Sequence, residues 1–259
     1  MKIEDWNELA ELDPCWSIIS ERGKQYGNWN ASTFFATGEG QLEEVMSHAD
    51  YLGFPVKRSC ALDFGCGIGR MTRAFAAHFD QVYGVDASET MIKLARQLNV
   101  SFANCRFLVS GEADLQMFAS NEFDMIYSWQ VLQNMRNRAV ALSIIQECVR
   151  VLKANGLLAF QCPSQLPSAL VAGRCKRLKT LMKLIGVKRA QLYRPLRALG
   201  VSRRFLYTRL RLWPDLDVRS IPQDQVVSVL ERAGARLLDI QRAPFANIPD
   251  ADRTYWVTK

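Results

Sequence analysis

The stretch Cys60-Ala-Leu-Asp-Phe-Gly-Cys-Gly-Ile-Gly-Arg70 decides the fold of this chain. It opens with an apolar run typical of a buried strand, and glycines follow at every second position: 65, 67 and 69. The segment 70–79 contains neither glycine nor proline and has a helical composition. A strand that turns sharply into a helix presents backbone N–H groups to a ligand, and glycine allows a close approach because it lacks a Cβ. The stretch therefore predicts a strand, a ligand-binding turn and a helix.

The glycine spacing excludes two common nucleotide sites. A dinucleotide fingerprint has the pattern G-x-G-x-x-G, but the sixth position counted from Gly65 is Arg70. A P-loop ends in G-K-[ST], which this stretch lacks. A second apolar run ends in Asp86, seventeen positions after Gly69. Nucleotide-binding α/β folds place a ribose-binding carboxylate near this position, so a nucleotide-like ligand is still indicated.

Strand and helix patterns alternate along most of the chain. We expect strands at 60–64, 81–86, 105–109, 123–128, 157–162, 236–242 and 253–258, and helices at 69–79, 88–98, 138–152 and 222–233. Ser88 is the expected N-cap of the second of these helices. Such alternation predicts an α/β fold with a doubly wound, mostly parallel sheet and helices on both faces.

The expected organisation has three parts. Residues 1–58 are rich in aromatic side chains and are interpreted as a helical N-terminal cap. Residues 59–163 and 215–259 would form the sheet domain, and residues 164–214 a basic helical insertion that acts as a lid. Between Pro163 and Pro214 there are thirteen Lys and Arg residues and no acidic one, so the rest of the chain is acidic overall.

Composition narrows the class of protein. With 259 residues, 49% of them hydrophobic, the chain can form one packed α/β domain with additions. No apolar run reaches the about 18 residues that a spanning helix needs, and the N-terminal residues lack the pattern of a secretory signal. The seven cysteines are scattered without a C-x-x-C pair, which predicts reduced thiols in a cytoplasmic protein. Two histidines argue against a His-based metal site, and we expect no metal.

Residues 61–72 resemble the first motif of the class I S-adenosylmethionine-dependent methyltransferases, whose glycine turn holds the methionine portion of the cofactor. The resemblance covers most of 58–163 and returns at 220–258. It implies a seven-stranded sheet whose last two strands form an antiparallel hairpin at the edge. It also implies that Asp86 accepts hydrogen bonds from both ribose hydroxyls.

Glu112 lies where many members of this family have aspartate, which implies that it accepts a hydrogen bond from the adenine amino group; glutamate is a departure from the pattern. S-adenosyl-L-methionine is therefore the expected cofactor. The residues that the resemblance assigns to it are Asp63, Gly65, Cys66, Gly67, Gly69, Asp86, Ala87, Glu112, Ala113 and Ser128.

The chemistry implied by this resemblance is in-line displacement of a methyl group from a sulfonium. Positioning alone can lower such a barrier by about 7–11 kcal/mol, and a general base would add about 10²–10⁴-fold. The candidate catalytic residues are His48 and Gln133, with Trp129 and Gln130 as further candidates to line the pocket. Many small-molecule methyltransferases have histidine where this chain has Asn134, which cannot act as a base.

The basic insertion is the expected determinant of substrate or partner. A basic amphipathic helix can lie on an anionic membrane, bind an acidic partner or cover a site with an acidic substrate; it can also be a lid whose charges are only solvated. We expect a small-molecule acceptor, anionic or linked to a lipid or glycan, methylated on oxygen or nitrogen. Peripheral membrane contact through 174–213 fits the charge, and the chain has no RNA-binding module. The alternatives are a non-catalytic cofactor-binding protein and an RNA methyltransferase.

Overall fold

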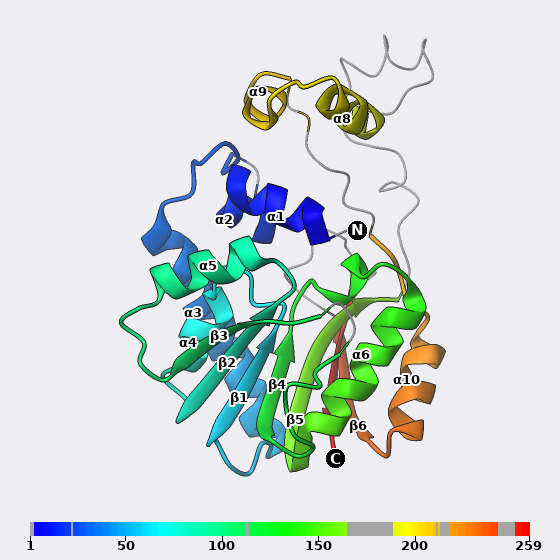
Figure 1. Cartoon of the computed structure of the whole chain (residues 1–259). Coiled ribbons are helices and arrows are strands. Elements are labelled where there is room, and N and C mark those ends of the chain that lie inside the picture. Colours follow the sequence, from blue (N-terminus) through cyan, green and yellow to red (C-terminus); the bar gives the residue numbers. More distant parts are fainter. Residues whose placement is uncertain are drawn as a thin grey trace.

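A seven-stranded sheet is the framework of the protein (Figure 1). The computed structural model describes residues 3–21, 23–111, 114–164, 189–210, 212, 218–242 and 252–259. The strand order is β3-β2-β1-β4-β5-β7-β6. The strands are β1 (Cys60–Phe64), β2 (Gln81–Asp86), β3 (Cys105–Val109), β4 (Phe123–Ser128), β5 (Leu152–Pro163), β6 (Arg236–Arg242) and β7 (Asp252–Thr258).

Strands β1 to β5 are parallel, and β7 runs antiparallel to both of its neighbours, β5 and β6. The expected mostly parallel sheet and its antiparallel edge hairpin are therefore confirmed. The ladder also explains why β5 begins earlier than expected. Leu152 pairs with Phe123 as soon as the preceding helix ends, and the register shifts before Leu157 pairs with Met125.

The helices begin and end close to the expected residues. They are α1 (Ile3–Leu12), α2 (Pro14–Ile18), α3 (Ala31–Leu52), α4 (Arg70–Phe75), α5 (Glu89–Leu98), the short 3₁₀ helix η1 (Leu132–Asn134), α6 (Arg138–Val151), α8 (Arg189–Ala198), α9 (Arg203–Thr208) and α10 (Gln223–Arg232). Ser88 caps α5 through a hydrogen bond from the Met91 N–H, as expected. Helix α4 is shorter than expected because the N–H groups of Ala76, Ala77 and His78 bond to carbonyls three residues earlier.

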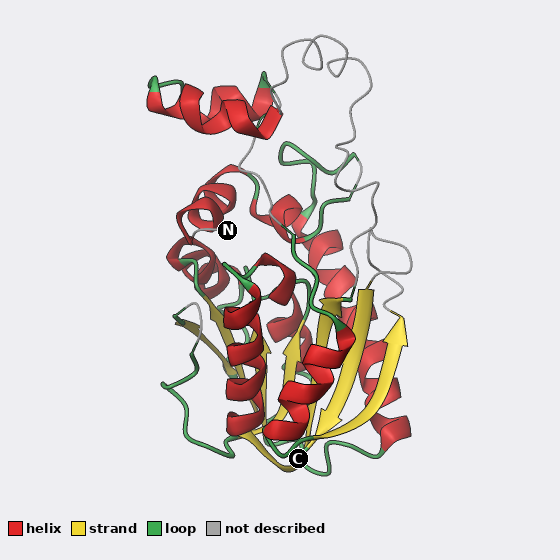
Figure 2. Cartoon of the chain, turned by 90° about the vertical axis from the view of Figure 1, so that its right-hand side faces the viewer, coloured by secondary structure: helices red, strands yellow, loops and turns green. Residues whose placement is uncertain are grey.

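Two hydrophobic cores cover the two faces of the sheet (Figure 2). Side chains alternate along each strand, so Ala61 of β1 packs with α3 and α4 whereas Leu62 packs in the core with α6 and α10. Helix α5 lies on the same face as α4, where Ile92 packs against Phe107 of β3. Helices therefore cover both faces, which confirms the doubly wound architecture.

Helices α1 and α2 lie beyond the carboxyl ends of the parallel strands, and α8 and α9 lie on the same side, further from the sheet (Figure 1). Residues 165–188 of the expected insertion lie outside the described residues. The boundaries between cap, sheet domain and insertion stay a prediction. Within the described part of the chain, no helix has the length and apolar character needed to cross a membrane.

Candidate active site

The candidate site lies at the carboxyl ends of β1, β2, β3 and β4. The chain leaves β1 toward α4 on one face of the sheet and leaves β4 toward α6 on the other, so a crevice opens between these two neighbouring strands. A cavity occupies this position. Its lining comprises Ile3, Trp6, Ser17, Ile18, Ser20, Phe64, Gly65, Gly67, Asp86, Ala87, Met91, Ser110, Gly111, Trp129, Gln130, Val131, Gln133, Asn134, Met135, Arg136 and Val218.

The glycine turn brings main chain to the cavity. Gly65 and Gly67 have φ angles of +79° and +53°, a left-handed conformation that residues with a Cβ rarely adopt. A Cβ on Gly65 would lie 2.2 Å from Cγ2 of Val131, and one on Gly67 would lie 2.6 Å from Cδ1 of Ile18. Both the conformation and the space therefore require glycine, and the turn presents bare backbone to a ligand.

Asp86 ends β2 and lies across the cavity from the β4 end. Its Oδ2 accepts a hydrogen bond from the Gly67 N–H at 2.9 Å, and its Oδ1 accepts one from the Ser88 N–H at 2.8 Å. Burial raises the pKa of this carboxyl above its ordinary value, and these backbone hydrogen bonds oppose the rise. A carboxylate oxygen has more than one lone pair, so both oxygens can still accept from a ligand hydroxyl. Ala87 also lines the cavity.

Asp63, Cys66 and Gly69 lie beneath the turn and are not among the lining residues. Asp63 is 3% exposed and accepts a hydrogen bond from Oγ1 of Thr72 at 2.6 Å. Burial raises the pKa of Asp63 to about 6, although Thr72 and the nearby charge of Arg70 oppose this. Cys66 packs among side chains of α5 and β3, and Gly69 is the N-cap of α4. These residues support the turn from below.

The segment after β4 forms the opposite wall. Trp129, Gln130 and Gln133 line the cavity, as expected for the first two and as required for any role of the third. The Gln130 N–H donates to Oε1 of Gln161 at 3.1 Å and so fixes the loop to β5. Oε1 of Gln133 and Oγ of Ser128 are buried and have no hydrogen-bond partner among the residues that the structure describes. Ser128 itself is not in the lining, so only Gln133 offers an unpaired polar atom in the cavity wall.

The structure does not bring His48 to the cavity. Helix α3 carries His48 to the region of β6 and β7, where its Nε2 lies 3.0 Å from Oδ2 of Asp239 and its ring packs against Trp256. The face of α3 that packs on these strands holds the histidine away from the carboxyl ends of β1 and β4. Glu112 and Ala113 lie outside the described residues, but Ser110 and Gly111 before them line the cavity.

The N-terminal helices contribute lining residues that the motif search did not find. Ile3 and Trp6 of α1, and Ser17 and Ile18 of α2, contact the cavity. Asn7 of α1 fixes this position, because its Oδ1 accepts from Oγ of Ser88 at 2.6 Å at the start of α5. The aromatic composition of residues 1–58 was the available signal, but no local pattern indicates which side chains face a ligand.

Helix α1 is also tied to the basic insertion, through a set of ion pairs that we call the acid–base clasp. Its members are Arg194 with Asp5 at 3.1 Å, Arg197 with Glu8 at 3.1 Å, Arg203 with Glu8 at 2.9 Å, and Arg203 with Glu11. Tyr207 of α9 extends the contact, since its hydroxyl donates to Oδ2 of Asp13 at 2.9 Å. Part of the basic charge predicted to meet an anionic substrate or surface is therefore neutralised within the protein.

Comparison with known proteins agrees with this geometry. Residues 62–160 match the family model described as a methyltransferase domain. A demethylmenaquinone methyltransferase from Staphylococcus saprophyticus is 32% identical over 133 residues, which are 49% of this chain and 55% of that protein. A ubiquinone biosynthesis O-methyltransferase from Xanthomonas oryzae pv. oryzae is 27% identical over 130 residues, 50% of this chain and 51% of that protein. The chain thus spans about half the length of these curated relatives.

Solved structures show the same fold along the whole chain. The magnesium protoporphyrin IX methyltransferase from Synechocystis, solved with bound S-adenosylhomocysteine, matches with a TM-score of 0.58 and 17% identity, over 99% of this chain and 98% of that one. A methyltransferase from Clostridium acetobutylicum matches with a TM-score of 0.55 and 12% identity, over 83% and 88% of the two chains. This chain therefore has the fold of the class I S-adenosylmethionine-dependent methyltransferases and contains their cofactor-binding methyltransferase domain.

Proposed function

We propose that this protein transfers a methyl group from S-adenosylmethionine to an oxygen or nitrogen atom of a small molecule. One observation carries the proposal. The glycine turn, Asp86 and the segment after β4 line a single cavity at the point where the strand order reverses. This arrangement combines a surface of bare backbone, a carboxylate and a polar wall, which are the groups that a charged nucleoside-like cofactor and a second small molecule require.

The residues of this cavity fit the cofactor. Gly65 and Gly67 leave a cradle that a Cβ would fill, and Asp86 keeps lone pairs that suit the ribose hydroxyls. Ser110 and Gly111 stand next to the expected adenine position. The bound cofactor supplies an electrophilic methyl group on a sulfonium. Asp63, Cys66 and Gly69 would act indirectly, by holding the turn in this conformation.

The lining supports catalysis by positioning. Among its described residues, the side chains that carry charge are Asp86 and Arg136, and neither is suited to remove a proton from an acceptor when Asp86 binds ribose. Alignment of the acceptor and exclusion of water then supply the rate enhancement. Oε1 of Gln133 is the buried atom available to accept a hydrogen bond from an acceptor hydroxyl or amine. We assign Gln133 an orienting role and none to His48.

The relatives support a small-molecule acceptor, because the two named above act, by their names, on demethylmenaquinone and in ubiquinone biosynthesis. We extend this to an acceptor that is anionic or linked to a lipid, since Arg136 places a cation in the lining. A non-catalytic cofactor-binding protein is the second candidate, favoured by the same shortage of proton-accepting groups. Methyl transfer from radiolabelled S-adenosylmethionine to any member of a quinol and carboxylate panel would decide between them.

Asp86 provides the test of the cofactor assignment. Asp86→Ala should weaken S-adenosylmethionine binding by about 1.5–3 kcal/mol, because it removes charge-assisted hydrogen bonds. Asp86→Asn should lose part of this, since the amide keeps one acceptor oxygen. Titration calorimetry measures both, and circular dichroism verifies that the variants fold.

Asp80→Ala is the matched control. This aspartate is exposed and precedes β2 at its amino end, whereas Asp86 ends the strand at its carboxyl end. The control should bind the cofactor as the parent does. Equal affinities for a folded Asp86→Ala variant and for the control would refute the assignment of this cavity to the cofactor.

A further inference from the structure

The arginines of α8 and α9 divide into two groups with different surroundings. Arg194, Arg197 and Arg203 belong to the acid–base clasp and face carboxylates of α1. Arg204 and Arg209 are exposed and form no ion pair with any residue that the structure describes. The clasp accounts for the first group, but the second group has no role in the fold or in the cavity.

Helix α9 is anchored through one side only. Leu206 and Tyr207 are 0% and 2% exposed, and the Tyr207 ring lies 4.9 Å from that of Tyr26 and 6.3 Å from that of Trp16. These contacts fix the helix against the N-terminal helices. They also fix which side chains α9 turns to the solvent, so its other side is a surface of defined composition.

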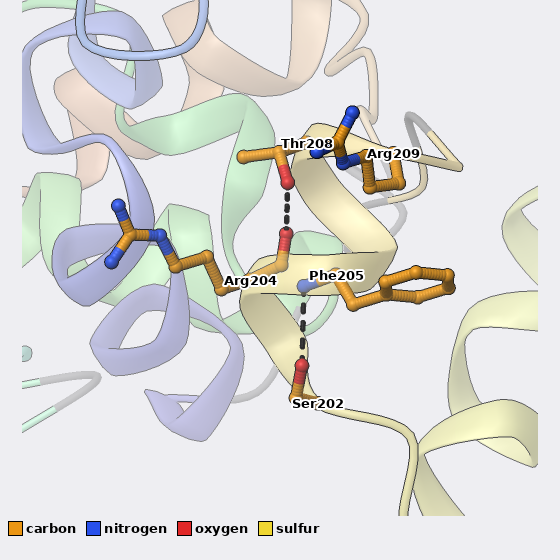
Figure 3. A pocket seen from close by; sticks show the side chains of 5 residues that line it. All are labelled: Ser202, Arg204, Phe205, Thr208 and Arg209. Atoms are coloured by element: carbon orange, nitrogen blue, oxygen red, sulfur yellow. Dashed lines mark hydrogen bonds between the residues drawn. The ribbon is translucent and has the colours of Figure 1, made fainter.

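We call this other side the outward face of α9; it consists of Ser202, Arg204, Phe205, Thr208 and Arg209. These residues line a shallow hollow on the surface, and Figure 3 shows the two guanidinium groups and the Phe205 ring extending away from the helix. Residues 204 and 208, and likewise 205 and 209, are four apart and so lie on one side of a helix. Both hydroxyls are engaged within the helix: Ser202 accepts from the Phe205 N–H and Thr208 donates to the Arg204 carbonyl.

Large apolar side chains accompany the cations. Phe205 is 49% exposed, Leu210 directly after Arg209 is 40% exposed, and Leu199 in the turn before α9 is 80% exposed. Such exposure of three large side chains around two arginines is unfavourable in water alone. Interfacial segments that bind membranes combine apolar side chains with Lys or Arg in this way.

We propose that the outward face of α9, with Leu199 and Leu210, docks on an anionic lipid surface. The guanidinium groups would contact lipid phosphates, and the apolar side chains would enter the boundary between head groups and acyl chains. No acidic residue lies between Pro163 and Pro214, so the segment carries nothing that repels the surface. The two leucines favour lipid over a nucleic acid, which would use stacking rings. The proposal does not depend on the proposed function.

The position of this face suits a membrane-associated protein. Helices α8 and α9 lie on the side of the sheet where the parallel strands end, which is also the side of the cavity (Figure 1). The clasp connects α9 to α1, and α1 lines the cavity through Ile3 and Trp6. A lipid surface bound by α9 would therefore lie on the same side as the cavity.

Vesicle sedimentation of the full chain tests the proposal. The parent should sediment with vesicles of phosphatidylcholine and phosphatidylglycerol and not with phosphatidylcholine alone. The double variant Arg204→Glu/Arg209→Glu should lower the vesicle affinity by about tenfold or more at low salt, since each basic residue contributes about 1 kcal/mol at an anionic surface. Phe205→Ser should also weaken binding, and high salt should restore less of the difference because its loss is apolar.

Arg232→Glu/Arg236→Glu is the control with the same change of charge. Both arginines are exposed, and they lie at the end of α10 and the start of β6. This control should sediment like the parent. Equal loss of binding in the control and the α9 variant, no binding of the parent to anionic vesicles, or binding of a labelled single-stranded RNA that α9 reversal abolishes while vesicle binding persists would each overturn the proposal.

Discussion

At the scale of single residues, Asp63 and Asp86 show how neighbouring strands give the same side chain different roles. Asp86 lines the cavity and keeps its charge beside two backbone N–H groups. Asp63 is buried one strand away, bonded to Thr72, and does not reach the cavity. The motif assigned both to the cofactor. Only Asp86 is placed to contact it, and Asp63 becomes a supporting residue whose effect is on stability.

Asp63 should make the stability of the protein depend on pH. Folding raises its pKa from 3.8 to about 6, so the native state binds this proton more tightly than the unfolded chain does. The stabilisation is fully present below pH 3.8 and is lost as the pH rises through 6. Its full size is about 3 kcal/mol. In Asp63→Asn this component should be absent.

Urea unfolding at a series of pH values checks this prediction. The difference in unfolding free energy between Asp63→Asn and the parent should change across the acidic window in favour of the variant at neutral pH. Asp80→Asn, at an exposed position, serves as control. Parallel pH curves for the parent and Asp63→Asn would show that burial does not perturb this carboxyl.

At the scale of elements, the contact between α3 and α4 determines how the glycine turn is supported. Gly38 of α3 lies against the first residue of α4, and a Cβ there would be 2.6 Å from the backbone oxygen of Arg70. The Arg70 side chain continues the contact, because its Nη2 donates to Oε1 of Gln41 at 2.7 Å. Gln41 in turn donates to the Tyr127 hydroxyl at 2.6 Å. This buried network links α3 to β4 directly below the cavity.

Gly38→Ala should therefore destabilise the protein by about 1–3 kcal/mol, because the backbone of Arg70 must move to admit the methyl group. It should also weaken cofactor binding, since α4 follows the turn. Denaturant unfolding and calorimetry measure the two effects.

Gly40→Ala is the control on the same helix. A Cβ at this exposed position meets no atom within 4 Å, so alanine should stabilise the helix by about 0.5–1 kcal/mol and leave cofactor affinity unchanged. Equal effects of the two substitutions would show that the approach of α3 to α4 does not constrain the turn.

At the scale of the whole molecule, the acid–base clasp joins segments almost two hundred positions apart. It places α8 and α9 over α1, whose side chains line the cavity. The ion pairs are partly exposed, so each contributes about 0.2–1 kcal/mol, but they act together on one helix. The clasp thus helps to hold the N-terminal wall of the cavity in place.

Arg203→Gln should loosen this wall, because Arg203 pairs with both Glu8 and Glu11. Amide hydrogen exchange in α1 should increase by about two- to fivefold, corresponding to about 0.5–1 kcal/mol. Arg204→Gln is the neighbouring control, since Arg204 forms no ion pair with a described residue. If the two variants exchange alike, the clasp does not anchor α1.

The sequence by itself determined the sheet, the glycine turn and the place of Asp86. Buried parallel strands appear as short apolar runs between helical segments, and a turn with φ above zero leaves glycine as its local mark, so these features are encoded within a few residues. The capping of α5 by Ser88 is local in the same sense.

Only the tertiary structure decided which polar residues meet at the cavity. It separated Asp63 from Asp86, carried His48 to Asp239, brought Ile3 and Trp6 to the cavity and paired Arg203 with α1. Each of these outcomes depends on contacts between segments far apart in the chain. Local patterns fix which elements form, but the direction in which a side chain points is set by the elements that pack against it.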